Sequence, residues 1–246
     1  MKVYDSVIKK TWDLLQQEDY RELKVDQQVS WNCLTNNEFL MDREIAFEIG
    51  DRMRPSIVFN AQTSDESLIS NDRIVLIGKD LNEIKENTNF SRITFFQVDE
   101  VEDSNKAYIG IKRLEYERFK VIPEGYMILS SSLANKENIR VSKKAVSQGI
   151  NFEIIGNLYL NHYKKLEGVN HAWIIFLVGD YPYINQLIDR SKEVDEITNA
   201  YDHILKNIIL DCAICPLKPI CEDIEALREL HFSRIDEKRK RLFEKK

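Results

Sequence analysis

The longest apolar run in the chain extends from Ala172 to Val178 and restricts the fold more than any other feature. A membrane-spanning helix needs roughly 20 consecutive apolar residues, so this run is too short to cross a bilayer. Its nearly continuous apolar character is typical of a strand that is buried on both faces of a sheet. We therefore expect a buried strand at residues 172–178 and no membrane segment.

Other segments show the periodicities of both strands and helices. Runs rich in β-branched and aromatic residues predict strands at 45–49, 56–59, 73–77, 92–96 and 126–130. Apolar residues at helical spacing predict helices from Asp5, over 104–119, over 158–165 and from Pro182. Because some strands follow one another directly and others are joined through helices, the sequence predicts an α+β fold. We expect a mixed sheet with flanking helices, followed by a C-terminal Cys loop and helix.

The length of 246 residues suits one large core or one domain with an appendage. We expect an N-terminal helical segment over 1–38, an α+β domain over 39–206, and the Cys loop with its helix over 207–246.

Charge and motifs exclude several classes of function. Lys and Arg total 35 against 41 Asp and Glu, a net charge of -6, so a general nucleic-acid-binding role is disfavoured. The N-terminus lacks the apolar core of a signal peptide, which predicts a cytoplasmic protein. The glycine motifs of dinucleotide-binding, P-loop and serine hydrolase sites do not occur.

Three of the four cysteines gather in one short segment. Cys212, Cys215 and Cys221 form the pattern C-x2-C-x5-C, interrupted by Pro216 and Pro219. In a reducing compartment such crowding indicates a metal site before disulfides. We expect the three thiolates to bind one metal centre, with the prolines preventing a regular helix through the loop.

The metal and its fourth ligand stay open at this point. Thiolates suit an iron–sulfur cluster, for which we expect the 4Fe–4S type, and zinc is the alternative. A helix is expected over 222–230, which places His231 too far from Cys221 to share one metal with it. Cys33, His203 and Asp211 are candidates for the fourth ligand, although we expect Cys33 to be a buried thiol beside Trp31.

Several stretches resemble the acetyl-CoA synthase (beta) subunit of the carbon monoxide dehydrogenase/acetyl-CoA synthase complex. Residues 139–149, Ile-Arg-Val-Ser-Lys-Lys-Ala-Val-Ser-Gln-Gly, are similar to that family's R-V-S-K-x-A-V-x-K-G, which precedes an aromatic-containing strand, here at Phe152. Residues 74–81 resemble its I-x-V-I-G-P-D-I, and residues 39–55 resemble its entry into the middle domain. The likeness is remote but collinear over roughly 39–221, and implies a stand-alone protein similar to the middle domain.

The departures from the family pattern concern the cysteines. In the family, the Cys pair begins the ligand set of a nickel–iron–sulfur cluster, and the third Cys lies further along than Cys221 does here. No Cys follows Cys221 in this sequence. The resemblance therefore implies an iron–sulfur accessory protein or subunit of anaerobic one-carbon or acyl-CoA metabolism, with a protein partner or a second copy, rather than a complete acetyl-CoA synthase.

The resemblance also implies a site for coenzyme A or an acyl-CoA. The matching positions are Arg140, Ser142 and Lys143, where Ser142 can cap a helix that Gly149 ends. A helix N-terminus with nearby positive charge suits a phosphate. The competing interpretation is an ordinary solvated helix start in which Arg140 pairs with a carboxylate.

Two alternatives to the accessory role remain. The protein could be an enzyme that exposes one iron of a three-Cys cluster to a small ligand. It could also be a zinc-stabilised protein-interaction module without catalysis.

Overall fold

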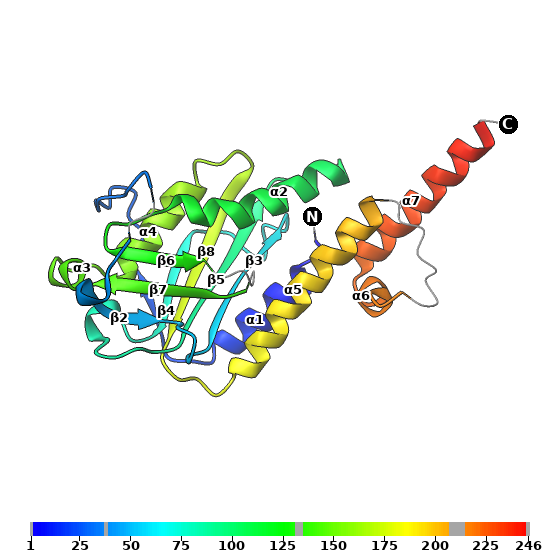
Figure 1. Ribbon diagram of the computed structural model, residues 1–246. Coiled ribbons are helices and arrows are strands. Elements are labelled where there is room, and N and C mark those ends of the chain that lie inside the picture. The colour runs from blue at the N-terminus through cyan, green and yellow to red at the C-terminus, as the bar shows by residue number, and fades with distance from the viewer. Residues whose placement is uncertain (1, 37–38, 131–134, 207–214, 245–246) are drawn as a thin grey trace.

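The computed structural model describes residues 2–36, 39–130, 135–206 and 215–244. Two sheets and their flanking helices form the body of the protein (Figure 1). The strands are β1 (Tyr20–Leu23), β2 (Ile45–Ile49), β3 (Ser56–Thr63), β4 (Arg73–Gly78), β5 (Phe90–Val98), β6 (Tyr126–Ser130), β7 (Glu137–Ser142) and β8 (Val169–Val178). The helices are α1 (Asp5–Leu15), α2 (Ser104–Glu117), α3 (Lys143–Ser147), α4 (Phe152–Tyr163), α5 (Ile184–Leu205), α6 (Lys218–Asp223) and α7 (Glu225–Glu244), with short 3-10 turns at Asp42–Glu44, Leu81–Glu83 and Arg118–Lys120.

The larger sheet has five strands in the order β1-β4-β8-β5-β3. β1 is antiparallel to β4, β4 is parallel to β8, β8 is antiparallel to β5, and β5 is parallel to β3. The smaller sheet has three antiparallel strands in the order β2-β7-β6. The α+β class and the mixed sheet predicted from the sequence are confirmed.

β8 occupies the centre of the larger sheet, and it is buried as its apolar run predicts. Its alternate side chains enter two different cores: Ile174 and Phe176 face α4 and the smaller sheet, whereas Ile175 and Leu177 face α1 and α5. All four side chains are 0% exposed. Because both faces are covered, the strand lacks the polar alternation of a half-exposed strand.

The N-terminal segment contains the predicted helix and a strand that the sequence did not predict. α1 and α5 cover the face of the larger sheet that carries Ile175 and Leu177, and the apolar residues on this face form the second core. α1 buries Val7, Ile8 and Leu15 in it. β1 then pairs with β4, so residues before 39 complete the larger sheet. The domain boundary at residue 39 stays a prediction, but the segment on its N-terminal side is not purely helical.

One local prediction is wrong. The segment at Phe152 is not a strand: Phe152 opens α4, because Asn151 accepts a hydrogen bond from the Ile154 N–H through its side chain at 2.8 Å and caps the helix. In the Cys loop, the described residues 215–217 are not helical and α6 begins only at Lys218, so no regular helix runs through this part of the loop. Pro219 lies in the first turn of α6, where a backbone N–H is not needed.

The C-terminal part of the chain leaves the body. α6 and the start of α7 pack against α5, and Leu227 is fully buried there. Beyond that contact, α7 projects away from both sheets (Figure 1). Among the described residues, no helix has both the length and the apolar character needed to cross a membrane.

Candidate functional site

Cys215 and Cys221 lie on either side of a turn that leads into α6. The Lys218 N–H donates to the Cys215 carbonyl at 3.1 Å, and the Cys221 N–H donates to the Leu217 carbonyl at 3.1 Å. Both side chains are partly exposed and neither is in a disulfide. Cys212, the third member of the predicted ligand set, lies outside the described residues, as does Asp211.

The surroundings of this segment are apolar on one side. Cys221 packs against the second core with its neighbours Leu217 and Ile220. Thiolates are the donors that iron–sulfur clusters and zinc prefer, so the two described cysteines fit either group in chemistry. Within the described residues, no three His, Cys, Asp or Glu side chains gather closely enough to hold a metal ion by themselves.

The candidates for a fourth ligand lie in different places. Cys33 is exposed rather than buried, because its segment runs over the surface and forms an isolated β-bridge with Pro123. That bridge precedes β6, whereas α6 lies at the other end of the protein (Figure 1). His203 lies in the last turn of α5, the helix against which α6 packs. Its Nδ1 atom is buried and has no hydrogen-bond partner in the described part of the chain.

The predicted anion site has the expected helix start. The Ser142 hydroxyl accepts a hydrogen bond from the Ala145 N–H at 3.0 Å and caps α3, which ends before Gly149 at a φ of 89°. The left-handed conformation at this position favours glycine. α3 has only 5 residues, so its aligned dipole is short.

The cationic side chains beside that helix already have partners within the chain. Arg140 Nε donates to Glu48 Oε1 at 2.8 Å, and a second nitrogen lies 3.6 Å from Asp42 Oδ1. Lys143 Nζ donates to the Arg43 carbonyl at 3.0 Å. An anion at this position would therefore compete with Glu48 for Arg140, and coenzyme A binding here stays a prediction.

A hollow of about 370 Å³ adjoins Arg140. Its lining includes Arg52 as a second cation, and Glu48 and Asp51 as carboxylates. The four charges balance, so this hollow lacks the positive excess that selects a phosphate.

The family model for the CO dehydrogenase/acetyl-CoA synthase complex beta subunit matches residues 29–172. The chain belongs to this family. No curated protein matches it. A role related to CO dehydrogenase/acetyl-CoA synthase follows for this beta-subunit family member.

The match to the beta-subunit family covers a continuous stretch in the middle of the chain. It includes the smaller sheet, the strands β3, β4 and β5 of the larger sheet, α2, α3, α4 and the positions Arg140, Ser142 and Lys143, and it ends inside β8. α1, α5, α6 and α7 lie outside it, and so do Cys212, Cys215 and Cys221. The family assignment and the Cys segment are therefore two independent observations.

Sequence reasoning missed a buried charged cluster between the two sheets. Arg92 and Glu137 form an ion pair in which both side chains are 1% exposed, and Arg118 Nε lies 3.6 Å from the same carboxylate. The one signal in the sequence is an arginine inside an otherwise apolar and β-branched run at β5. No pattern near Arg92 in the sequence indicates its partner Glu137, which lies 45 residues away.

Proposed function

We propose that this beta-subunit family member binds a 4Fe–4S cluster through Cys212, Cys215 and Cys221. The observation that carries the proposal is the C-x2-C-x5-C segment, in which Cys215 and Cys221 are partly exposed and outside any disulfide. In this role the protein serves as an accessory protein or subunit in anaerobic one-carbon or acyl-CoA metabolism and works in the cytoplasm.

His203 is our candidate for the fourth ligand. Its buried Nδ1 atom has no hydrogen-bond partner among the described residues, and α5 carries it to the helix end where α6 packs. A buried imidazole nitrogen without a partner is costly, and metal coordination would satisfy it. Cys33 is unsuitable, because its bridge to Pro123 holds it near the smaller sheet.

The function as a subunit requires a protein partner or a second copy of the chain. The family description names a complex, which supports the first. α7 projects from the body, and its Phe232 is 60% exposed, which offers a surface for such a contact. A zinc-stabilised interaction module is the alternative, because three thiolates and an imidazole also suit zinc.

Anaerobic purification followed by iron, sulfide and zinc analysis tests the proposal. A brown protein with iron and sulfide and broad visible absorbance is expected. Cys212→Ser, Cys215→Ser and Cys221→Ser should each remove most of the iron, because each loses a thiolate ligand outright. Cys33→Ala is the matched control and should keep the metal content unchanged.

His203→Ala separates the fourth ligand from the other three. If His203 binds iron, the variant should keep part of the cluster and change its electron paramagnetic resonance spectrum after reduction. A colourless wild-type protein with one zinc per chain would replace the iron–sulfur proposal by the zinc alternative. Loss of metal from Cys33→Ala, with metal kept in Cys221→Ser, would show that the ligand assignment is wrong.

A further inference from the structure

An open hollow lies between α5 and the segment that joins β2 to β3. Its volume is about 600 Å³. Residues 52–57, which end in the first residues of β3, form one side together with residues 135–136, which lead into β7. The other side is a face of α5 on which four residues recur at helical spacing: Ile188, Ser191, Lys192 and Asp195. Neither the Cys segment nor Arg140 belongs to the described lining, so this hollow is separate from both candidate sites.

The charges of this lining do not balance. The described lining contains four cations, which define what we call the basic hollow: Arg52, Arg54, Lys136 and Lys192. Its one carboxylate is Asp195, so the net charge is +3, and Asp195 already accepts a hydrogen bond from Asn135 Nδ2 at 2.5 Å. Arg52 also lines the hollow beside Arg140, and without it the net charge here is still +2. This excess stands out on a chain whose overall charge is -6.

The cations of the basic hollow are available to a partner. All four side chains are exposed. Within the described residues, no ion pair or side-chain hydrogen bond involves Arg52, Arg54 or Lys136. Lys192 lies 3.5 Å from Asp189, and the two side chains are 65% and 67% exposed, a degree of exposure at which ion pairs contribute little. An anionic partner would therefore not have to displace a strong internal contact.

Apolar side chains accompany these charges. Met53 is 87% exposed, Pro55 beside it is also exposed, and Ile188 lines the same hollow from α5. A methionine side chain is flexible and adapts to the surface of a partner. Met and Arg are both enriched in protein interfaces relative to the rest of the surface. The basic hollow therefore suits an occupant that presents carboxylates together with an apolar side chain.

The shape of the hollow favours a protein segment over a small anion. Small-molecule sites enclose most of the surface of their ligand, whereas the cations here are all exposed. Phosphate sites commonly use the backbone N–H groups of a helix start. α5 begins at Ile184, and its residues in the lining start at Ile188, beyond the first turn. The helix thus presents a side face, along which an elongated segment can lie.

We propose that the basic hollow docks an acidic segment of a partner subunit. Carboxylates of that segment bind the four cations, and an apolar side chain between them packs against Met53. The proposal rests on the subunit role proposed above, and the family description, which names a complex, supports a protein as the occupant. Because the chain as a whole is negative, a local positive surface would also orient an acidic partner as it approaches.

A synthetic peptide tests the proposal on the full chain. In this peptide, pairs of Glu alternate with single Leu residues, and its binding is followed by fluorescence anisotropy. The Glu peptide should bind, and added salt should weaken its binding because the contacting charges are exposed. Two matched peptides, with Gln or Lys in place of Glu, should not bind.

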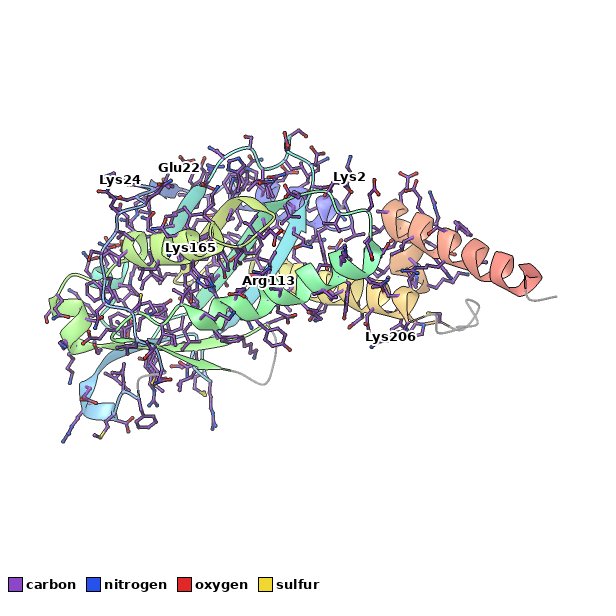
Figure 2. All side chains as sticks on the ribbon, turned by 90° about the horizontal axis from the view of Figure 1, so that it is seen from above. Lys2, Glu22, Lys24, Arg113, Lys165 and Lys206 are labelled. Atoms are coloured by element: carbon purple, nitrogen blue, oxygen red, sulfur yellow. The ribbon has the colours of Figure 1, made fainter. Side chains whose placement is uncertain are left out.

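Double variants locate the binding. Arg54→Gln/Lys136→Gln removes two cations of the basic hollow and should weaken binding of the Glu peptide roughly two- to thirtyfold. Lys24→Gln/Lys165→Gln is the matched control, because it removes the same charge from two exposed lysines that do not line the hollow (Figure 2). The control should bind as wild type does. Circular dichroism without peptide shows whether each variant folds, and Arg52→Gln/Lys192→Gln decides if the first variant does not.

The outcomes separate this proposal from its alternatives. It is overturned if the Glu peptide binds no more tightly than the Gln peptide, or if the hollow variant and its control weaken binding equally. It is also overturned if inorganic phosphate or adenosine diphosphate binds more tightly than the Glu peptide and Arg54→Gln/Lys136→Gln weakens that binding, since the hollow is then a phosphate site. A wild-type dimer that the same variant dissociates in sedimentation would make a second copy the occupant and overturn the proposal as well.

Iron analysis of the same preparations keeps the docking proposal distinct from the cluster proposal. Protein without iron that binds the Glu peptide would refute the cluster and support the docking surface. Protein with iron that does not bind the peptide would do the reverse.

Discussion

Arg92 of β5 and Glu137 of β7 form an ion pair that joins the two sheets across their shared core. Arg92 Nε donates to Glu137 Oε2 at 3.2 Å, and Arg92 Nη2 contacts the other carboxylate oxygen. The Ser56 hydroxyl, on β3, donates to the Glu137 carbonyl at 2.7 Å and accepts from its N–H at 3.0 Å. The two sheets are therefore held together by side-chain as well as apolar contacts.

Breaking this pair should strongly destabilise the fold. Glu137→Gln leaves Arg92 as a buried charge without its carboxylate, and we expect a loss of about 3–5 kcal/mol in urea unfolding. The double variant Arg92→Met/Glu137→Leu should lose less than Glu137→Gln, because only Arg118, and not both guanidinium groups, then loses the Glu137 carboxylate.

The pair of Arg73 and Glu22 is the matched control. Glu22 is 57% exposed, so Glu22→Gln should cost less than about 1 kcal/mol. Equal losses in Glu137→Gln and Glu22→Gln would contradict a special role for the buried pair.

Glu117 should give the protein part of its resistance to acid. Burial raises the pKa of Glu117, but hydrogen bonds from Lys120 and His162, at 2.8 Å each, outweigh burial and lower it below the usual carboxyl range. The pKa of Glu117 is therefore lower in the folded state than in the unfolded state. Glu117 thus stabilises the fold at pH values above its unfolded-state pKa. That contribution is lost as the pH falls through the folded value.

Unfolding measured as a function of pH tests the direction of the Glu117 pKa shift. The stability difference between wild type and Glu117→Gln should be greatest near neutral pH and should shrink as the pH falls below the usual carboxyl range. A difference that grows in acid would show that the pKa of Glu117 is shifted in the opposite direction.

Gly78 should not tolerate a side chain. Its φ is 92°, and a Cβ atom there would lie 2.0 Å from the Val178 carbonyl oxygen at the end of the central strand. Gly78→Ala should therefore destabilise the protein by more than the roughly 1–2 kcal/mol of left-handed strain alone. Gly110→Ala in α2 is the control. A Cβ there meets nothing within 4 Å, and we expect it to stabilise the fold by about 0.4–1 kcal/mol in thermal unfolding.

If coenzyme A binds beside α3, its phosphate must compete with the Glu48 carboxylate for Arg140, and this competition can be tested. If a phosphate binds Arg140, Glu48→Gln should strengthen binding, because it removes the carboxylate that now accepts from Arg140 Nε. Arg140→Ala should weaken binding more than about tenfold in calorimetric titration. Equal affinities in wild type and both variants would leave Ser142 as a helix cap with no ligand role.

The sequence predicted those parts of the fold whose signal is local. The apolar run of β8 and the helical spacing of α2 and α5 were sufficient, because burial on a sheet or helix face leaves a period in the sequence. β7 was missed because only Ile139 and Val141 of its six residues are apolar, which is too weak a pattern to predict a strand. β1 has no such pattern, and only its pairing with β4 makes it a strand.

In the candidate sites too, only features that lie close together in the sequence could be predicted. The spacing of Cys212, Cys215 and Cys221 can be read directly from the sequence. The partner of Arg140 cannot, since Glu48 lies 92 residues earlier and is brought beside it by the pairing of β2 with β7.

The position of β8 has a consequence for the order in which the protein can fold. β4 and β5 are complete by residue 98, but they do not pair with each other, and β8 must enter between them. During synthesis both strands expose unpaired edges until residue 178 has left the ribosome. Pairings between such distant segments slow folding, and open edges invite association between nascent chains. We therefore expect the yield of folded protein to depend on chaperones and on temperature more than its final stability would suggest.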